Sequence, residues 1–170
     1  MSPLATLMQG TDEEAYRKAI RFIEYRARST GETRDRLRKW GYGQETTELV
    51  LGRLARAGLL DDREFGRTFV EELVRKGLGS FRIRSELLKK RLDRELVECL
   101  MESLDHEEER ERARAAAVRR YSALSGTIGA AKAREKTFAY LLRRGYSVED
   151  AGGACANAEQ VDTETGAELE

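Results

Sequence analysis

The chain has 170 residues, of which 36% are charged and 7% aromatic, with one proline and a formal net charge of zero. This composition is typical of exposed helices around modest cores. No β-branched run alternates with period two, so strands are not expected. No apolar run is long enough to cross a membrane.

Charge is distributed unevenly along the chain. Residues 16–60 hold 11 basic and 5 acidic residues, a net charge of +6, whereas residues 159–170 hold five acids and no base. A basic first segment suits an anionic partner, although a solvated helix surface explains it as well.

The stretch that begins at Gly58 combines one helix end with one helix start. Gly58 can take a left-handed C-cap. Asp61 is placed to accept hydrogen bonds from the first free amides of the next helix, with Glu64 as its capping-box partner. Phe65 and Phe69 follow on one apolar face. The pattern predicts a unit of helix, tight turn and helix.

Similar signals along the chain predict nine helices between two disordered ends, at residues 1–11 and 159–170. The expected helices span residues 12–27, 29–39, 45–57, 62–76, 80–91, 93–104, 106–123, 130–143 and 148–158. Their expected inward positions include Leu37, Trp40, Leu49, Leu88 and Leu142.

Individual helix ends carry their own signals. Ser29 and Glu32 have the spacing of a capping box, and Asp93 is the expected N-cap of the sixth helix. Ser125-Gly126 is expected to end the seventh helix, because glycine is a poor helix former.

The second helix of each unit carries the clearest repeat. An apolar anchor, a basic pair and a turn recur in Leu37-Arg38-Lys39-Trp40-Gly41-Tyr42, Leu87-Leu88-Lys89-Lys90-Arg91-Leu92 and Leu141-Leu142-Arg143-Arg144-Gly145-Tyr146. A period near 50 residues fits an array of helix triplets better than one globule, and each small triplet should lean on its neighbour. We therefore predict an all-α fold of three tandem three-helix repeats, at 12–60, 61–104 and 105–158, in an elongated, curved right- or left-handed array.

Residues suited to catalysis or metal binding are few. His106 is the single histidine, and no nucleophile or ligand lies near it in sequence. Helix capping explains Asp61-Asp62 better than a metal site does, and phosphate loops, nucleotide fingerprints and zinc spacings are missing. Cys99 and Cys155 stand in no metal or redox spacing, and without a signal peptide they indicate a reducing cytoplasm. We expect a cytoplasmic protein that is not an enzyme and needs no cofactor or metal.

Surface cations are the better binding candidates. Arginine suits anionic partners because its planar fork makes bidentate hydrogen bonds to carboxylate or phosphate. Recurrence in successive units favours a shared binding role, whereas salt-bridged surface charge is the alternative for any single residue. The candidate partner-binding residues are Arg34, Arg38, Arg75, Lys76, Arg82, Arg84, Arg143 and Arg144.

Several stretches resemble the RecX regulatory proteins of bacteria. The central signature is Leu59-Leu60-Asp61-Asp62-Arg63-Glu64-Phe65 with Phe69-Val70, then Lys76-Gly77-Leu78-Gly79-Ser80-Phe81-Arg82-Ile83-Arg84-Ser85-Glu86-Leu87. Arg26-Ala27-Arg28-Ser29 with Leu37 resembles the first repeat, and Phe138-Ala139-Tyr140-Leu141-Leu142-Arg143-Arg144-Gly145-Tyr146 the third. The resemblance covers residues 13–150. The chain departs from the family at Gly66 (usually Ala), at Lys90-Arg91-Leu92 (usually Lys-Gly-Ile) and near Ala151 (usually a larger hydrophobe).

The resemblance implies three tandem three-helix repeats in an elongated, curved, monomeric protein that binds the RecA recombinase. Family members lodge in the helical groove of the RecA–DNA filament and typically restrain its extension, ATP hydrolysis and strand exchange, in recombinational DNA repair and the SOS response. Some also bind single- or double-stranded DNA directly. Because the family has no tight contact motif, the candidate residues above rest on their chemistry alone.

A sequence-independent DNA-binding protein built from helix-turn-helix-like triplets is the alternative. DNA binding should weaken steeply with salt, whereas groove binding needs the assembled filament. Tyr16, Tyr25, Trp40 and Tyr42 are expected at the edge of the core rather than stacked on bases.

Overall fold

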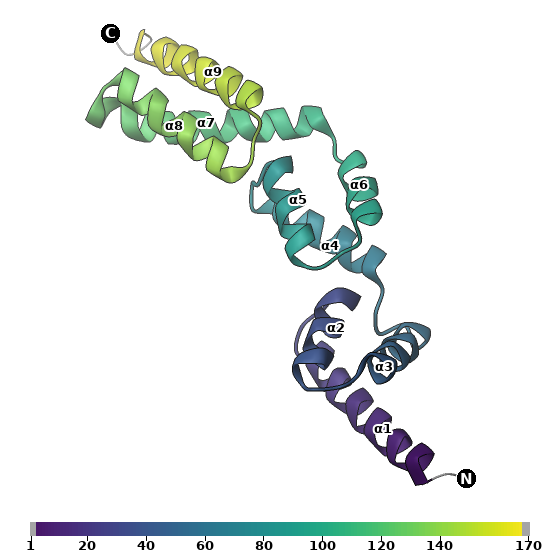
Figure 1. Cartoon of the computed structure of the whole chain (residues 1–170). Helices are drawn as coiled ribbons and strands as arrows, with labels where there is room; N and C mark the ends of the chain where they lie inside the picture. Colours follow the sequence, from purple (N-terminus) through teal and green to yellow (C-terminus); the bar gives the residue numbers. More distant parts are fainter. Residues whose placement is uncertain (1–2, 168–170) are drawn as a thin grey trace. The chain divides into compact units, whose positions relative to one another are not determined.

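A computed structural model describes residues 3–167, with side chains described from residue 11 to residue 164. Within this range the chain forms nine helices joined by turns and no strand, as Figure 1 shows. The helices are α1 (Pro3–Glu24), α2 (Thr30–Lys39), α3 (Gln44–Arg56), α4 (Asp62–Arg75), α5 (Ser80–Lys89), α6 (Arg94–Glu102), α7 (His106–Ile128), α8 (Ala130–Arg144) and α9 (Val148–Ala167). The all-α fold predicted from the sequence is confirmed.

Equivalent positions are buried in all three repeats. Their offset is 50 residues between the first and second repeats and 54 between the second and third. The completely buried sets are Leu37, Leu87 and Leu141 in the second helices, and Thr47, Val97 and Ala151 in the third helices. This shared register confirms three tandem three-helix repeats.

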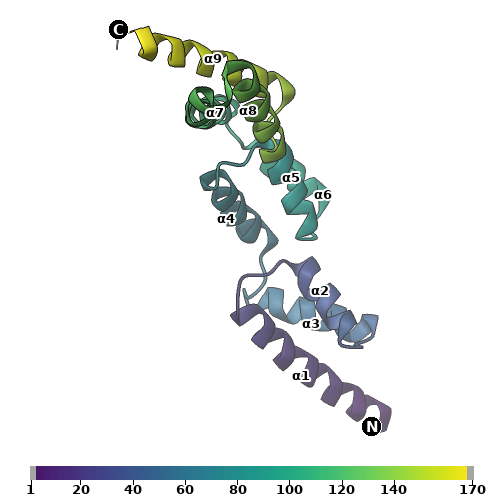
Figure 2. The ribbon, with the colours of Figure 1, turned by 90° about the vertical axis from the view of Figure 1, so that its left-hand side faces the viewer.

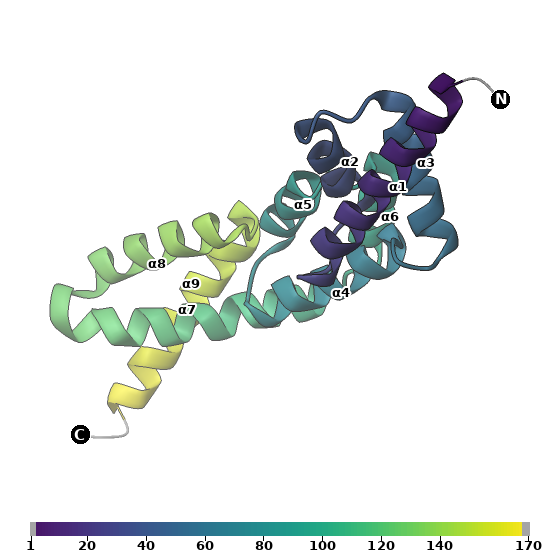
Figure 3. The ribbon, with the colours of Figure 1, turned by 90° about the horizontal axis from the view of Figure 1, so that it is seen from below.

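The chain divides into two compact units. Unit 1 comprises Met1–Phe69 with Leu87–Val97, and unit 2 comprises Val70–Glu86 with Glu98–Glu170. In unit 1, α1 packs on α2 and α3, and the three lie side by side in Figures 1 and 2. In unit 2, α7, α8 and α9 pack against one another, and Figure 3 shows α7 and α8 running alongside each other.

Two core clusters differ in side-chain size. The cluster around α1, α2 and α3 in unit 1 comprises Ala15, Ala19, Leu37, Val50, Leu51, Leu54 and Leu60. The cluster around α7, α8 and α9 in unit 2 comprises Ala113, Ala117, Tyr121, Ala133, Leu141, Tyr146, Ala151, Ala154, Cys155 and Ala158. Alanine lets helix backbones approach closely, and dense packing then supplies dispersion contacts that large side chains supply elsewhere. The small residue at position 151 is therefore one of six alanines in this cluster.

The predicted helix caps at three turns are confirmed. Ser29 Oγ accepts the backbone N–H of Glu32 at 3.0 Å, and the Glu32 carboxylate accepts the N–H of Ser29 at 3.4 Å. Asp61 Oδ1 accepts the N–H of Glu64 at 3.0 Å, and Asp93 Oδ1 accepts a first-turn N–H of α6 at 2.9 Å. The Glu64 carboxylate, predicted to complete a capping box, pairs with an arginine one turn further along α4.

The N-terminal end is helical where the sequence predicts disorder. Because α1 begins at Pro3, residues 3–11 belong to it, and the predicted start at Asp12 is wrong. Proline is accepted in the first turn of a helix, and the Leu, Ala, Met and Gln residues that follow are good helix formers. Residues 1–2 lie outside the described part of the chain.

Helix α7 continues past the glycine predicted to end it. It runs through Gly126 to Ile128, and the chain breaks only at Gly129, where φ is +82°. Leu124 and Ile128 pack against the core of unit 2. Their burial outweighs the roughly 1 kcal/mol that an interior glycine costs.

Helix α9 also extends beyond its predicted end. It continues to Ala167, so helix replaces the predicted disordered tail over residues 159–167, while 168–170 lie outside the described residues. Ala158 is completely buried, and Arg134 Nη1 of α8 lies 3.6 Å from Glu159 Oε2. These contacts with neighbouring helices stabilise a segment that its composition alone leaves unstable.

Three leucines predicted to face inward are exposed. Leu49, Leu88 and Leu142 are 42%, 40% and 38% exposed. Each precedes or follows a core residue in the same helix, and neighbouring helix positions point about 100° apart. The core stripe therefore runs through Val50, Leu87 and Leu141 instead. Trp40, also predicted buried, is half-buried.

Candidate partner-binding surface

Within each unit, the end of one second helix docks on the start of another. We call the residues at which the second helix of a repeat ends the docking turn: residues 40–41, 90–91 and 144–145. The receiving end is the start of the preceding repeat's second helix, at residues 29–31 in unit 1 and 79–81 in unit 2. Docking places a negative helix C-terminus against a positive helix N-terminus, which is electrostatically favourable.

In unit 2 the docking turn supplies backbone acceptors. The carbonyl of Arg144 accepts the N–H of Gly79 at 2.9 Å, and the carbonyl of Gly145 accepts the N–H of Phe81 at 3.1 Å. Both N–H groups lie at the start of α5, where backbone N–H groups have no acceptor within their own helix. The docking turn therefore acts as a cap for α5.

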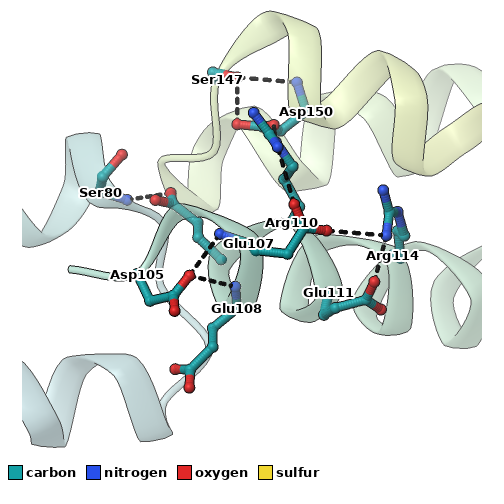
Figure 4. Close-up of polar contacts among 10 residues, drawn as sticks. Ser80, Asp105, Glu107, Glu108, Arg110, Glu111, Arg114, Ser147 and Asp150 are labelled. Carbon is teal, nitrogen blue, oxygen red and sulfur yellow. Dashed lines mark hydrogen bonds and ion pairs between the residues drawn. The ribbon is translucent and has the colours of Figure 1, made fainter.

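A carboxylate on α7 completes this receiving end. The Oε1 atom of Glu109 accepts the N–H of Ser80 at 2.7 Å, a contact that Figure 4 shows at the Ser80 amide. Glu109 is only 3% exposed, so this buried charge is stabilised by a charge-assisted hydrogen bond. A negative charge at a helix N-terminus is also favoured by the helix dipole.

Glycine allows the backbones at this junction to touch. Gly145 has φ +89°, and a Cβ there would lie 2.3 Å from the Cβ of Arg82. A Cβ on Gly79 would lie 2.4 Å from the carbonyl oxygen of Gly145. Such distances exclude any side chain at either position without a shift of the backbone.

The junction in unit 1 repeats the arrangement with different residues. Ser29 Oγ donates to the carbonyl of Lys90, and Asp62 Oδ1 accepts the N–H of Thr30 at 2.7 Å. A Cβ on Gly31 would lie 2.3 Å from the Cβ of Arg91. Asp62 thus has the role that a buried glutamate has in unit 2.

Arg91 explains how the chain departs from the family's Lys-Gly-Ile turn. It adopts φ +59°, a left-handed conformation that usually favours glycine, and its Nε lies 3.1 Å from Asp35 Oδ2. Because the opposite residue is Gly31, the space for the Arg91 Cβ comes from the receiving end. The unit 1 junction therefore has its glycine on the receiving end alone, at Gly31, whereas the unit 2 junction has one on each side, Gly79 and Gly145.

The Glu32 carboxylate gathers cations at the unit 1 junction. Its Oε1 lies 2.8 Å from Arg26 Nη2, 3.8 Å from Arg28 Nη1 and 3.5 Å from Lys90 Nζ. The side chain of Glu32 is only 16% exposed, so these pairs are screened less than surface ion pairs. The receiving end thus presents acid to a cationic docking turn.

Two of the candidate arginines form equivalent ion pairs within their repeats. Arg34 Nε lies 2.9 Å from Glu48 Oε1, with a second contact of 3.3 Å, and Arg84 pairs with Glu98. Both pairs join the second helix of a repeat to its third, at the same 50-residue offset. The hydrogen bond raises the pKa of Arg34 and lowers the pKa of Glu48. Structural pairing therefore explains why these arginines recur.

Most of the other candidates also have partners. Arg82 Nε lies 2.9 Å from Glu86 Oε1, Lys76 pairs with Glu72, Arg75 Nε donates to the Glu71 carbonyl at 3.4 Å, and Arg144 donates to the Lys76 carbonyl. Among the described residues, no ion pair is recorded for the exposed side chains of Arg38 and Arg143. Arg34 and Arg38 belong to unit 1, and the other six belong to unit 2. Their partner-binding role stays a prediction.

The start of α7 shows how the charge of this helix is satisfied internally. Asp105 Oδ1 accepts the backbone N–H groups of Glu107 and Glu108, and these bonds lower the pKa of Asp105. Arg110 pairs with Glu107 at 3.0 Å and with Asp150 of α9 at 3.4 Å, as drawn in Figure 4. The acidic start of α7 is therefore used for capping and pairing within unit 2.

Unit 1 contains a cluster of cations and aromatic rings that the sequence did not predict as a site. The rings of Phe22 and Trp40 meet edge to face with centroids 5.9 Å apart. The Arg36 guanidinium lies 5.1 Å from the Trp40 ring centre, and the Arg28 guanidinium lies 4.3 Å from the Phe22 ring centre. These distances are typical of cation–π contacts.

An open hollow of about 330 Å³ adjoins these rings, lined by Lys18, Arg21, Phe22 and Trp40. The first three lie at positions i, i+3 and i+4 of α1, a spacing that places them on one helix face. That spacing was the only sequence signal for the hollow, because Trp40 comes from the end of another helix. The hollow can offer both a flat apolar surface and positive charge to a ligand.

The described residues contain no group of three or more His, Cys, Asp or Glu side chains that could hold a metal ion. No helix in this part of the chain is both long and apolar enough to span a membrane. Cys155 is buried, which raises the pKa of its thiol, and Cys99 is exposed.

Comparison with known proteins places the chain in a family. The models for the first and second three-helix domains of RecX match residues 15–54 and 61–101. The regulatory protein RecX of Amycolatopsis mediterranei is 34% identical over 139 residues, which cover 79% of this chain and 79% of that protein. The chain belongs to the RecX family.

Other RecX proteins agree with this assignment. The regulatory protein RecX of Mycolicibacterium smegmatis is 33% identical over 141 residues, covering 80% of this chain and 74% of that protein. The crystal structure of RecX from Lactobacillus salivarius superposes with a TM-score of 0.77 at 18% identity, over 88% of this chain and 97% of that chain. That RecX structure therefore shares the fold.

Proposed function

We propose that this RecX-family protein binds RecA and the RecA–DNA filament groove, and restrains filament extension, ATP hydrolysis and strand exchange. The observation that carries the proposal is its likeness to regulatory RecX proteins over most of both chains. The setting would be recombinational DNA repair and the SOS response in the cytoplasm. In this role the protein acts by binding and not as an enzyme.

Tandem repeats suit a partner that is itself a repeating polymer. If two repeats bind two RecA subunits, the second contact is intramolecular and gains an effective concentration in the millimolar range. The same chain then binds an assembled filament far more tightly than one free subunit. Filament restraint follows because the bound protein links neighbouring subunits.

The ATPase activity of RecA on single-stranded DNA tests the proposal. We expect hydrolysis to fall when the protein is added at stoichiometric amounts to a preformed filament, and to fall further with time as subunits that leave are not replaced. An unchanged rate at stoichiometric protein contradicts the proposal. Addition of a heat-unfolded sample of the same protein controls for nonspecific effects.

Direct DNA binding is a second candidate function, favoured by the hollow that Lys18, Arg21, Phe22 and Trp40 line. Aromatic rings beside cations can stack bases while the cations contact phosphates. Anisotropy of a labelled oligonucleotide without RecA would test it at 50 and 200 mM salt. Binding that weakens steeply with salt would favour DNA as the primary partner.

A further inference from the structure

Of the three docking turns, the one in repeat 1 accepts no backbone hydrogen bond from another helix start among the described residues. The turn at residues 90–91 lies against the start of α2, and the turn at 144–145 lies against the start of α5. At the equivalent turn of repeat 1, a Cβ built on Gly41 has no heavy atom within 4 Å. A Cβ built on Gly145 would lie 2.3 Å from the Cβ of Arg82. Repeat 1 therefore carries an unoccupied docking turn.

The unoccupied turn has the backbone geometry of an occupied one. Gly41 and Gly145 both have φ +89°. The N–H of Tyr42 donates to the Leu37 carbonyl at 3.2 Å, and the equivalent bond in repeat 3 has the same length. The carbonyls of residues 40 and 41 therefore have the same backbone geometry as those of residues 144 and 145. In unit 2, the latter two carbonyls accept N–H groups from the start of α5.

The side chains around the unoccupied turn are mainly cationic. Lys39 is exposed with no recorded partner among the described residues, and the Arg36 guanidinium lies over the Trp40 ring. Two acids lie close by and are already used: Glu14 pairs with a lysine of α1 at 2.7 Å, and Asp35 pairs with the docking turn of repeat 2. In unit 1 the occupied docking turn places its cations against acids of the receiving end, so an acidic occupant is expected here.

A second copy of this chain is not a suitable occupant. Two of its receiving ends, at residues 29–31 and 79–81, are filled by its own docking turns. The third, the start of α8 at Gly129, is open, but its first turn carries no acid and includes Lys132, so it does not complement the cations of the unoccupied turn. The occupant must therefore bring a helix start from another protein. Negative side chains in the first turn of a helix are common because they complement its dipole.

We propose that the docking turn of repeat 1, with the cations of Arg36 and Lys39, receives the acidic N-terminal end of a helix on RecA. The carbonyls of Trp40 and Gly41 accept N–H groups of the first turn of that helix, and the two cations pair with its acids. The contact reproduces between proteins the junction that the chain forms twice within itself. It rests on the proposed function, since RecA is its partner.

A charge-reversal pair tests this surface. The double variant Arg36→Glu/Lys39→Glu is compared with Arg56→Glu/Arg63→Glu, which makes the same charge change at two exposed arginines of unit 1. Affinity is measured on immobilised RecA filaments assembled on single-stranded DNA. We expect the first variant to bind about tenfold or more weakly, about 1.4 kcal/mol, and the control to stay within about twofold of the wild type.

Further measurements separate the possible outcomes. Circular dichroism melts check that both variants keep the wild-type fold. A Trp40→Ala variant, which leaves the net charge unchanged, should also bind filaments more weakly. If the wild type itself does not bind filaments, the proposed function fails. If the wild type binds filaments and both double variants bind equally well, the inference about the docking turn is overturned while the proposed function stands.

Two other results would also overturn the inference. Equal losses of affinity for the oligonucleotide without RecA and for the filament would assign the surface to nucleic acid. A concentration-dependent dimer in sedimentation velocity, lost in Arg36→Glu/Lys39→Glu, would assign it to a second copy. Unchanged oligonucleotide binding and a monomer at all concentrations, together with weaker filament binding, support a protein partner.

Discussion

Gly145→Ala and Gly41→Ala form a matched pair that measures the junction in unit 2. Both glycines have φ +89°, so an alanine costs about 1–2 kcal/mol of left-handed strain at either position. At Gly41 the new methyl group meets open space, whereas at Gly145 it lies 2.3 Å from the Cβ of Arg82. Forcing a methyl group into such a contact typically costs a further 1–3 kcal/mol or so.

The difference between the two variants is the quantity to measure. For a chain of this size about 1 kcal/mol shifts the melting temperature by roughly 2–4 °C. We therefore expect Gly145→Ala to melt about 2–12 °C below Gly41→Ala, with Gly41→Ala itself below the wild type. Thermal unfolding is followed by far-UV circular dichroism. Equal melting temperatures for the two variants would show that the docking turn of repeat 3 does not contact α5 in solution.

Three other outcomes follow from particular contacts. The charge reversal Arg84→Glu should lower the free energy of unfolding in urea by up to about 1 kcal/mol, and the added substitution Glu98→Arg should restore it. A double variant no more stable than Arg84→Glu would mean that this ion pair does not form. The folded state lowers the pKa of Asp105, so the ionised carboxylate stabilises the folded protein above its ordinary pKa near 4, and this stabilisation is lost as the pH falls through the lowered pKa. Asp105→Asn should therefore flatten the acid side of a curve of unfolding free energy against pH. A thiol reagent should label Cys99 in the native protein and reach Cys155 only after unfolding, since Cys155 is 1% exposed; rapid double labelling would contradict its burial.

Much of the fold was predictable because local signals agreed with the repeat. The capping box of Ser29 and Glu32 and the anchors Leu37, Leu87 and Leu141 follow from spacing alone, and the structure confirms them. Helix ends were less predictable where tertiary packing decides them. The continuation of α7 through Gly126 depends on side chains that bury against other helices, which local sequence does not reveal. The elongated, curved arrangement of the repeats stays a prediction.

The candidate site was only partly accessible from the sequence. The recurrence of Arg34 and Arg84 indicated a shared role, but the acids that bind them, Glu48 and Glu98, come from another helix. Sequence spacing alone could not separate a cation used for internal pairing from one free for a partner. The docking turn of repeat 1 stands out as a candidate surface only because the equivalent turns of repeats 2 and 3 contact the starts of α2 and α5.

The departure at Arg91 shows how a fold tolerates a substitution at a turn. A non-glycine residue at φ +59° is strained, and the cost is offset by an ion pair with Asp35 and by the missing side chain of Gly31. The residue without a side chain that this close contact needs stands at position 31 of the receiving end and not at position 91 of the turn. A family pattern read residue by residue therefore misses compensation between positions 60 residues apart.

Co-sedimentation with RecA compares the assembled filament with the free subunit in one experiment. The protein is mixed with equal concentrations of RecA, either assembled on single-stranded DNA with a slowly hydrolysed ATP analogue or left unassembled, at physiological salt. We predict that it pellets with filaments at stoichiometric amounts and binds free RecA much more weakly. Protein that stays in the supernatant with filaments present would contradict its role as a RecA filament regulator.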